Sequence, residues 1–193
     1  MVKKEKDARG REEQIVEEKL RKLKEMRKNN IEPYPHTFDK KHSSQYIHEK
    51  YSYLKKQEQC KCNLQIAGRI ISIRDIGKII FINLRDNKGD IQIVLQENET
   101  PKNKVDFFKN YIDAGDFIGV KGNAFRTKRG ELSVLGKDIL LLSKSIKPLP
   151  SKWHGLQDKE ERYRKRYLDL IMNPDVKNVF HKRDQILNTI IEN

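Results

Sequence analysis

The middle of the chain alternates aliphatic and polar residues with a period of two, which is typical of half-buried β-strands. Residues rich in Ile, Val, Leu and Phe fall into five runs between Leu64 and Leu142. The predicted strands are residues 64–74, 78–86, 90–96, 116–125 and 131–142. Turns containing Gly77, Gly89, Gly115 and Gly130 separate them.

A helix is predicted between the third and fourth strands. Thr100 offers an N-cap and Pro101 suits the first helical position. Val105, Phe108 and Ile112 then share one face. Three strands, a helix and two strands is the order of the OB-fold, in which the helix closes one end of the barrel. The predicted class is mainly β with flanking α, a five-stranded OB-fold barrel with an N-terminal helix and C-terminal linker helices.

The N-terminal region, residues 1–61, is predicted to be a basic tail followed by helices. Apolar residues recur at helical spacing over residues 11–29, among Lys, Arg and Glu, until Pro33 and Pro35 stop the pattern. The basic side chains of this helix either hold nucleic-acid phosphates or form a charged face toward solvent, which the interspersed glutamates favour. Residues 1–10 are expected to be disordered, and a second short helix is expected near residues 44–54.

The barrel domain, residues 62–146, is followed by a predicted linker over residues 147–175. Pro148 and Pro150 favour an extended start. Asp158 and Glu161 have the spacing of a capping box, so one helix is expected from there until Asn173-Pro174. Residues 176–193 begin another apolar helix that finds no partner in the sequence and should promote association.

Charge narrows the range of partners. Lys and Arg number 41 against 28 Asp and Glu, giving a net charge of +13 that favours phosphate backbones or anionic lipid. No apolar run approaches the ~20 residues that span a bilayer, and the first residues lack the apolar segment of a secretory signal. We therefore expect a cytoplasmic protein without a membrane partner.

Cys60 and Cys62 are the only cysteines. Their spacing, without further Cys or His pairs, does not make a four-ligand zinc site. Two reduced thiols and no metal are expected, with metal or redox use as the alternative.

Strand parity indicates a base-reading face. If Ile80, Ile82 and Leu84 fill the barrel, then Phe81 points outward together with Asn83 and Arg85. In the next strand the same rule leaves Gln92 outside, with Asp90 and Gln96. An exposed aromatic ring among hydrogen-bonding side chains suits the stacking and edge recognition of an unpaired base. An outward Phe on a strand is otherwise ordinary.

Two basic loops are expected beside this face, because OB-folds bind oligonucleotides with strands two and three and the loops joining strands one to two and four to five. The first loop contains Arg74 and Lys78. The second contains Arg126, Lys128 and Arg129. Together with Lys78 of the first loop, these three residues are candidates for contacts with the RNA backbone.

Glu131 follows the second loop and is also predicted to face outward. It either accepts a hydrogen bond from a base edge, holds an arginine, or forms an ion pair with Lys128 or Arg129.

Several residues within the barrel resemble the anticodon-binding domain of class II aspartate, asparagine and lysine tRNA ligases. They are Ala67-Gly68-Arg69, Gly77-Lys78, Phe81, Leu84, Asp86 and Gln92. The string from Leu149 to Asp158, followed by Glu161 to Arg164 and Arg166 to Leu170, is similar to lysine–tRNA ligases in particular. Ile31 to Pro35 also suits that family.

The resemblance implies that Phe81 stacks on the anticodon of tRNA(Lys), that Gln92 reads the middle uridine with Arg74 beside it, and that Glu131 lies near another anticodon base. It also implies a homodimeric enzyme that attaches lysine to tRNA using ATP and Mg²⁺. In such an enzyme residues 147–175 would be the hinge to the class II catalytic domain, and residues 176–193 would be the start of that domain, truncated here. Nothing here matches the second and third class II motifs, so no catalytic residue and no cofactor is assigned to this chain.

We expect the chain to act as the N-terminal part of such an enzyme, whether as a fragment, a truncated reading frame or a free-standing protein, and to be inactive in lysine activation alone. The alternative is an OB-fold RNA-binding factor acting in trans. A third reading is a protein-interaction barrel.

Overall fold

The computed structural model describes residues 2–150, 156 and 158–192. The chain forms two compact units, Met1–Pro148 and Leu149–Asn193. Part of the predicted linker, residues 151–155 and 157, lies outside the described residues.

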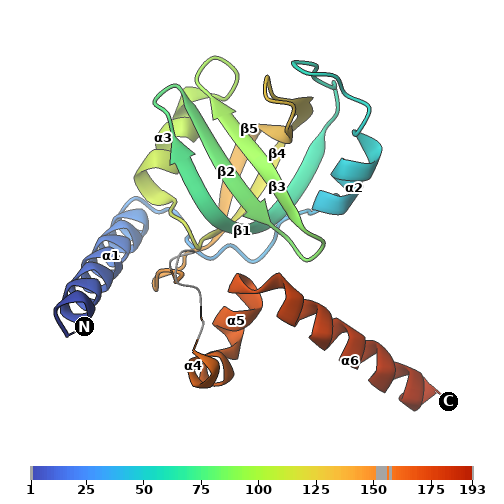
Figure 1. Ribbon diagram of the computed structural model, residues 1–193. Coiled ribbons are helices and arrows are strands. Elements are labelled where there is room, and N and C mark those ends of the chain that lie inside the picture. Colours follow the sequence, from blue (N-terminus) through green and yellow to red (C-terminus); the bar gives the residue numbers. More distant parts are fainter. Residues whose placement is uncertain (1, 151–155, 157, 193) are drawn as a thin grey trace. The chain divides into compact units, whose positions relative to one another are not determined.

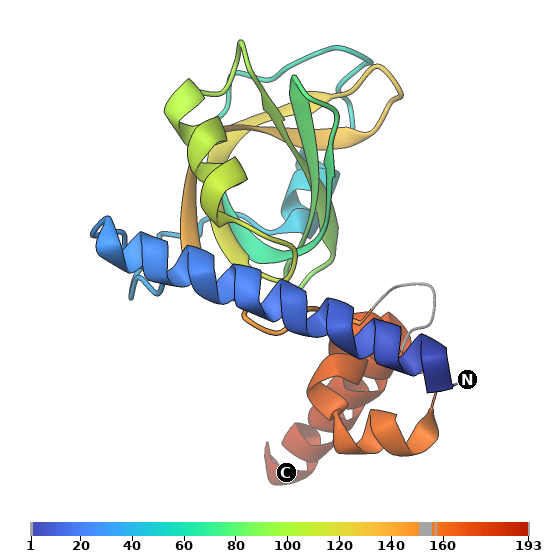
Figure 2. The same cartoon turned by 90° about the vertical axis from the view of Figure 1, so that its left-hand side faces the viewer.

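Five strands close into a barrel in the first unit (Figures 1 and 2). They are β1 (Leu64–Asp75), β2 (Ile79–Arg85), β3 (Asp90–Gln96), β4 (Phe117–Arg126) and β5 (Leu132–Ser143). The order around the barrel is β1-β2-β3-β5-β4, with every neighbouring pair antiparallel except β3 and β5. The predicted strands and the mainly β class are confirmed, with each strand end within one residue of its expected place.

The predicted parity of β2 and β3 is also confirmed. Ile80, Ile82 and Leu84 are at most 2% exposed, whereas Phe81 and Asn83 are only half-buried. In β3 the inward set is likewise buried. Burying aliphatic side chains from every strand supplies the main stabilisation of the barrel.

Short helices lie at opposite ends of the ring of strands, as the two views together show (Figures 1 and 2). At one end α3 (Lys102–Tyr111) contributes Val105 and Phe108 to the core, as predicted. At the other end α2 (Ser44–Lys50) contributes Ile47.

Thr100 does not cap α3, so that prediction was wrong. Pro101 occupies the N-cap position without a side-chain hydrogen bond. The Thr100 hydroxyl is buried and donates to the Gly136 carbonyl oxygen at 2.7 Å, while accepting from the Gln96 amide at 3.2 Å. It satisfies barrel backbone groups instead of the helix end.

The N-terminal helix α1 spans Val2–Lys28 and is longer than predicted. The expectation of disorder for residues 1–10 was therefore wrong from Val2 onward. Residues 2–10 contain no proline, and six of them, three Lys with one Glu, one Ala and one Arg, favour helix, which outweighs the single Gly10.

Buried ion pairs hold the C-terminal half of α1 against the barrel. The fully buried Lys144 donates to Asp116 at 2.8 Å, to Asp113 at 2.5 Å and to the Tyr111 carbonyl oxygen. Asp113 also accepts from Lys22 of α1 at 2.6 Å. Because each ammonium donor of Lys144 has a partner, these buried charges are compensated.

The second unit contains α4 (Lys159–Arg164), α5 (Arg166–Met172) and α6 (Pro174–Glu192). Asp158 caps α4 by accepting from the Glu161 amide at 2.7 Å, as predicted. The single helix expected from there to Asn173 is instead broken at Lys165 (φ −113°, ψ 50°). The break accompanies a buried Asp169, which accepts from Arg162, Arg166 and Asn173.

Asp86, at the end of β2, ties α2 to the barrel. Its carboxylate accepts from the Ser44 amide at 3.0 Å, from the Ser44 hydroxyl at 2.6 Å and from Lys40 at 3.2 Å. The amides of Lys88 and Gly89 in the following turn also donate to it. Burial raises the pKa of Asp86, but the donors of Ser44, Lys88 and Lys40 outweigh burial and bring it below its ordinary value.

The first prediction is that Asp86→Asn destabilises the barrel by about 1–3 kcal/mol at pH 7, because the new amide faces the Ser44 and Lys40 donors and leaves them unpaired. An aspartate with a lowered pKa contributes stability above its unfolded pKa of ~3.9 and loses it as the pH falls through the folded value. Urea unfolding should show a difference that shrinks below pH ~4. Asp39→Asn at an exposed position is the control, and equal loss in both variants would contradict the prediction.

Candidate nucleic-acid interface

The strand register arranges the outer face of the barrel into two rows. One row is largely apolar and runs Arg74, Phe81, Val94, Leu135 across β1, β2, β3 and β5. The next row is polar and runs Ser72, Asn83, Gln92, Ser133 across the same strands. The apolar row thus lies directly beside a row of hydrogen-bonding side chains.

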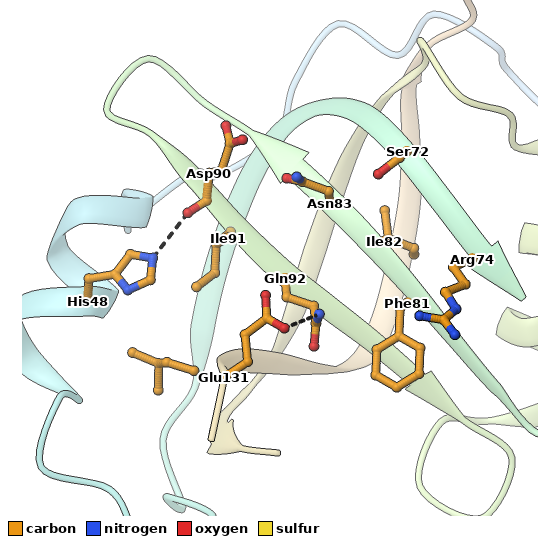
Figure 3. Close-up of a pocket in the computed structure, with 11 residues that line it drawn as sticks. His48, Ser72, Arg74, Phe81, Ile82, Asn83, Asp90, Ile91, Gln92 and Glu131 are labelled. Atoms are coloured by element: carbon orange, nitrogen blue, oxygen red, sulfur yellow. Dashed lines mark hydrogen bonds between the residues drawn. The ribbon is translucent and has the colours of Figure 1, made fainter. Parts of the chain in front are cut away.

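Two adjoining clefts open on this face, with volumes of about 620 and 300 Å³. The four residues predicted to bind the anticodon, Arg74, Phe81, Gln92 and Glu131, line both clefts. We call these four residues the saddle, because they are the boundary that the clefts share. Figure 3 shows the smaller cleft, with Gln92 and Glu131 between Phe81 and the more distant His48.

The Gln92 carboxamide is held at both ends. Its Nε2 donates to Glu131 Oε2 at 2.7 Å (Figure 3), and its Oε1 accepts from the Ser133 hydroxyl at 2.9 Å. A carboxylate only accepts, so the nitrogen must face Glu131. One N–H and one oxygen lone pair of Gln92 remain for a ligand, which is the donor and acceptor pair that a base edge recognises.

Glu131 is positioned by the loop between β4 and β5. Its amide donates to Thr127 Oγ1 at 3.0 Å, and its carbonyl oxygen accepts from the Thr127 amide at 2.9 Å. Gly130 has φ +91°, a conformation that favours glycine and closes this tight loop. Of the roles left open by the sequence, the ion pair with Lys128 or Arg129 does not occur among the described residues. Glu131 instead orients Gln92.

The neighbours of Phe81 in its row are buried apolar residues. Its cross-strand neighbour Val94 is 2% exposed, and the next residue in the row, Leu135, is 3% exposed. Phe81 itself is only half-buried, and Phe125 lines the larger cleft nearby. Such a half-exposed ring can stack on a base with its outer face, while its buried apolar neighbours keep it in position.

The predicted cations divide into different roles. Lys128 and Arg129 are exposed at the rim of the larger cleft. Arg126 also lines that cleft, but its guanidinium donates to the carbonyl oxygens of Gly130 at 2.8 Å and Ser52 at 2.7 Å, so it braces the loop. Lys78 is exposed but lines neither cleft.

Three side chains of the site were not assigned from the sequence. Ser133 holds Gln92, whereas His48 and Ser72 line the smaller cleft. Asn83 also lines it, and parity had already placed Asn83 outward. Ser133 and His48 could not be found by parity, because one depends on the pairing of β3 with β5 and the other on where α2 docks.

Cys60 and Cys62 are half-buried, and neither forms a disulfide. Burial raises the pKa of the Cys60 thiol. The Cys62 sulfur accepts from the Ala124 amide at 3.3 Å, so this segment runs beside β4.

Residues 64–142 match the family described as the OB-fold nucleic acid binding domain of the tRNA anti-codon type. The chain is similar to the lysine–tRNA ligase of Thermotoga maritima, at 42% identity over 180 residues. Lysine–tRNA ligases of Dehalococcoides mccartyi and Methanoculleus marisnigri are 45% and 41% identical over 180 and 172 residues. The first two alignments cover 93% of this chain and 36% of the relatives, so the chain spans about a third of their length.

Among residues 2–150, 156 and 158–192, no helix combines the length and hydrophobicity that crossing a bilayer requires.

The second prediction concerns the orientation of Gln92. Glu131→Ala should release its side-chain amide, because the charge-assisted bond to Nε2 disappears. In NMR spectra the Gln92 side-chain NH₂ signals should move toward those of a free glutamine and exchange faster with water. The side-chain signals of Gln96, which lines the larger cleft, should stay in place. Unchanged Gln92 signals would show that Glu131 does not hold it.

Proposed function

We propose that this chain, whose residues 64–142 belong to the OB-fold nucleic acid binding family and which is homologous to lysine–tRNA ligases over 93% of its length, recognises the tRNA(Lys) anticodon stem-loop. The saddle is the recognition element in this proposal. The observation that carries it is the fixed Gln92 amide, which lines the same two clefts as the half-exposed Phe81 and lies in the neighbouring row of the sheet.

The residues that line the two clefts have distinct tasks in binding. The middle anticodon base stacks on Phe81, where unpaired bases gain most of their affinity for such proteins. Its edge meets the free N–H and oxygen lone pair of Gln92, a complement to the adjacent acceptor and donor of a uracil. Lys128 and Arg129 at the rim pair with phosphates, which adds affinity without sequence preference.

The wider activity is proposed from the relatives named lysine–tRNA ligase. The complete enzyme, a cytoplasmic homodimer, attaches lysine to tRNA with ATP and Mg²⁺. This chain contributes recognition, and no residue of it is assigned to ATP, Mg²⁺ or lysine. The alternative, an RNA-binding factor acting in trans, draws on the fact that the whole groove is formed within the Met1–Pro148 unit.

The third prediction is that Phe81→Ala weakens binding to a lysine anticodon stem-loop by about 1–3 kcal/mol, nearly independently of salt, because stacking is lost. Fluorescence titration of the full chain measures the change. Phe117→Ala, at an exposed phenylalanine on β4 that lines neither cleft, is the matched control. If wild-type protein binds the stem-loop no better than an unrelated hairpin at moderate salt, anticodon recognition is wrong and a protein-interaction barrel gains support.

The same titrations separate stacking from electrostatics. Lys128→Ala and Arg129→Ala should lower affinity equally for all loop sequences and flatten the dependence on salt concentration, because each removes one phosphate contact. Gln92→Ala should instead reduce discrimination at the middle base. A Phe81→Ala variant that unfolds would show that Phe81 is a structural residue.

A further inference from the structure

Both cysteines of the chain lie in a bulged segment beside β4. Before the segment, Gln59 pairs with Phe125 of β4. After it, Leu64 pairs with Gly122 of the same strand. The four residues 60–63 therefore face only the two residues that lie between Gly122 and Phe125. Two extra residues on one strand form a bulge, which interrupts the ladder of backbone hydrogen bonds.

The Cys62 sulfur turns back onto this bulge. It accepts from the Ala124 amide at 3.3 Å, and its thiol donates to the Cys60 carbonyl oxygen at 3.8 Å. The Cys60 amide donates to the carbonyl oxygen of the same Ala124 at 2.8 Å. The Cys62 thiol thus takes the place of the backbone carbonyl oxygen that a regular ladder would offer to the Ala124 amide.

The spacing of the two cysteines is compatible with a disulfide. Residues i and i+2 of a strand point to the same face, and their Cα atoms lie ~6.6 Å apart when the strand is extended. Disulfides join residues whose Cα atoms are about 4.4–6.8 Å apart, and a bulge bends the strand and shortens this separation. A ring closed across a single intervening residue is strained, and strained disulfides are readily reduced again.

The surroundings of Cys60 decide how fast the pair reacts. Burial, and after it the neighbouring Cys62 thiol, raises the pKa of Cys60, whereas Tyr53 and Lys50 act in the opposite direction. Cys60 is therefore mostly protonated at pH 7. Because the thiolate is the nucleophile in thiol–disulfide exchange, the reaction should become faster as the pH rises above 7.

The segment that carries the thiols also holds the end of β4. The Gln57 amide donates to the Arg126 carbonyl oxygen at 2.8 Å, and the Arg126 amide donates to the Glu58 carbonyl oxygen at 3.0 Å. Arg126 in turn braces the loop between β4 and β5 through its guanidinium. A chemical change at the two thiols therefore acts on a segment that is hydrogen-bonded to the base of this loop.

We propose that Cys60 and Cys62 form a thiol–disulfide exchange site, which a low-molecular-weight disulfide oxidises reversibly, and that oxidation frees the Ala124 amide of β4. One cysteine thiolate attacks a sulfur of the small disulfide and expels one thiolate, which leaves a mixed disulfide. The second cysteine thiolate attacks the protein sulfur of this mixed disulfide and expels the other thiolate. Both cysteines lose a proton, the pair gives up two electrons, and the small disulfide departs as two thiols. This chemistry does not depend on anticodon recognition.

The fourth prediction is that the folded chain, equilibrated with mixtures of reduced and oxidised glutathione, loses the mass of two hydrogens as the mixture becomes more oxidising. Reduced glutathione in excess should restore them. Because the chain has only two cysteines, this change in a monomer identifies the bond. Cys60→Ser and Cys62→Ser are the matched controls, and each should instead gain the mass of one glutathione. Stable glutathione adducts on the wild-type chain, disulfide-linked dimers, or thiols that stay reduced in every mixture would overturn the site.

Amide hydrogen exchange measured by NMR tests the effect on β4. In the oxidised chain the Ala124 amide should exchange about fivefold faster, the factor that corresponds to the loss of one hydrogen bond. Val120, in the middle of β4, is the internal reference and should keep its rate. An Ala124 rate that is equal in both states would contradict the release of its amide. Loss of the β-sheet signal in circular dichroism on oxidation would overturn a reversible site.

Discussion

The parallel pairing of β3 with β5 is the constraint on which the rest of the structure depends. It joins Gln92 to Ser133 and Val94 to Leu135, residues about forty positions apart in the chain. The pairing closes the barrel, so the aliphatic interior is sealed and no long strand edge is left open. The same pairing brings Glu131 within 2.7 Å of Gln92. Closure of the barrel and the geometry around Gln92 therefore depend on the same strand pairing.

Much of this arrangement could be predicted from local pattern. Alternation with a period of two is a property of each strand alone, so parity placed Phe81 and Gln92 outward without knowledge of the strand order. Ser133 could not be assigned, because its role depends on a parallel pairing between distant strands. Thr100 was misassigned as a helix cap because its hydroxyl is used inside the barrel, where it donates to the Gly136 carbonyl oxygen of β5 and accepts from the Gln96 amide. Local sequence patterns do not predict the role of a residue whose hydrogen-bond partner lies on a distant strand.

The surplus of positive charge has several structural uses. Lys144 is fully buried and pairs with Asp116 and Asp113, while Lys22 of α1 pairs with the same Asp113. Arg126 supports the loop between β4 and β5. Lys128 and Arg129 remain exposed at the groove. A net charge of +13 therefore overstates the number of cations available for phosphates. Position relative to the groove, and not the total, decides which basic residues contribute to the salt dependence of binding.

The central claim is that Glu131 acts through Gln92 in reading the middle base. A double-mutant cycle with Gln92→Ala and Glu131→Ala, titrated with the lysine anticodon stem-loop and its middle-base variant, tests it most directly. If Glu131 serves to hold the amide, each single variant and the double variant should lose nearly the same discrimination, with a coupling energy of about 0.5–3 kcal/mol. Losses that simply add would mean that the two residues act separately, and would contradict the account.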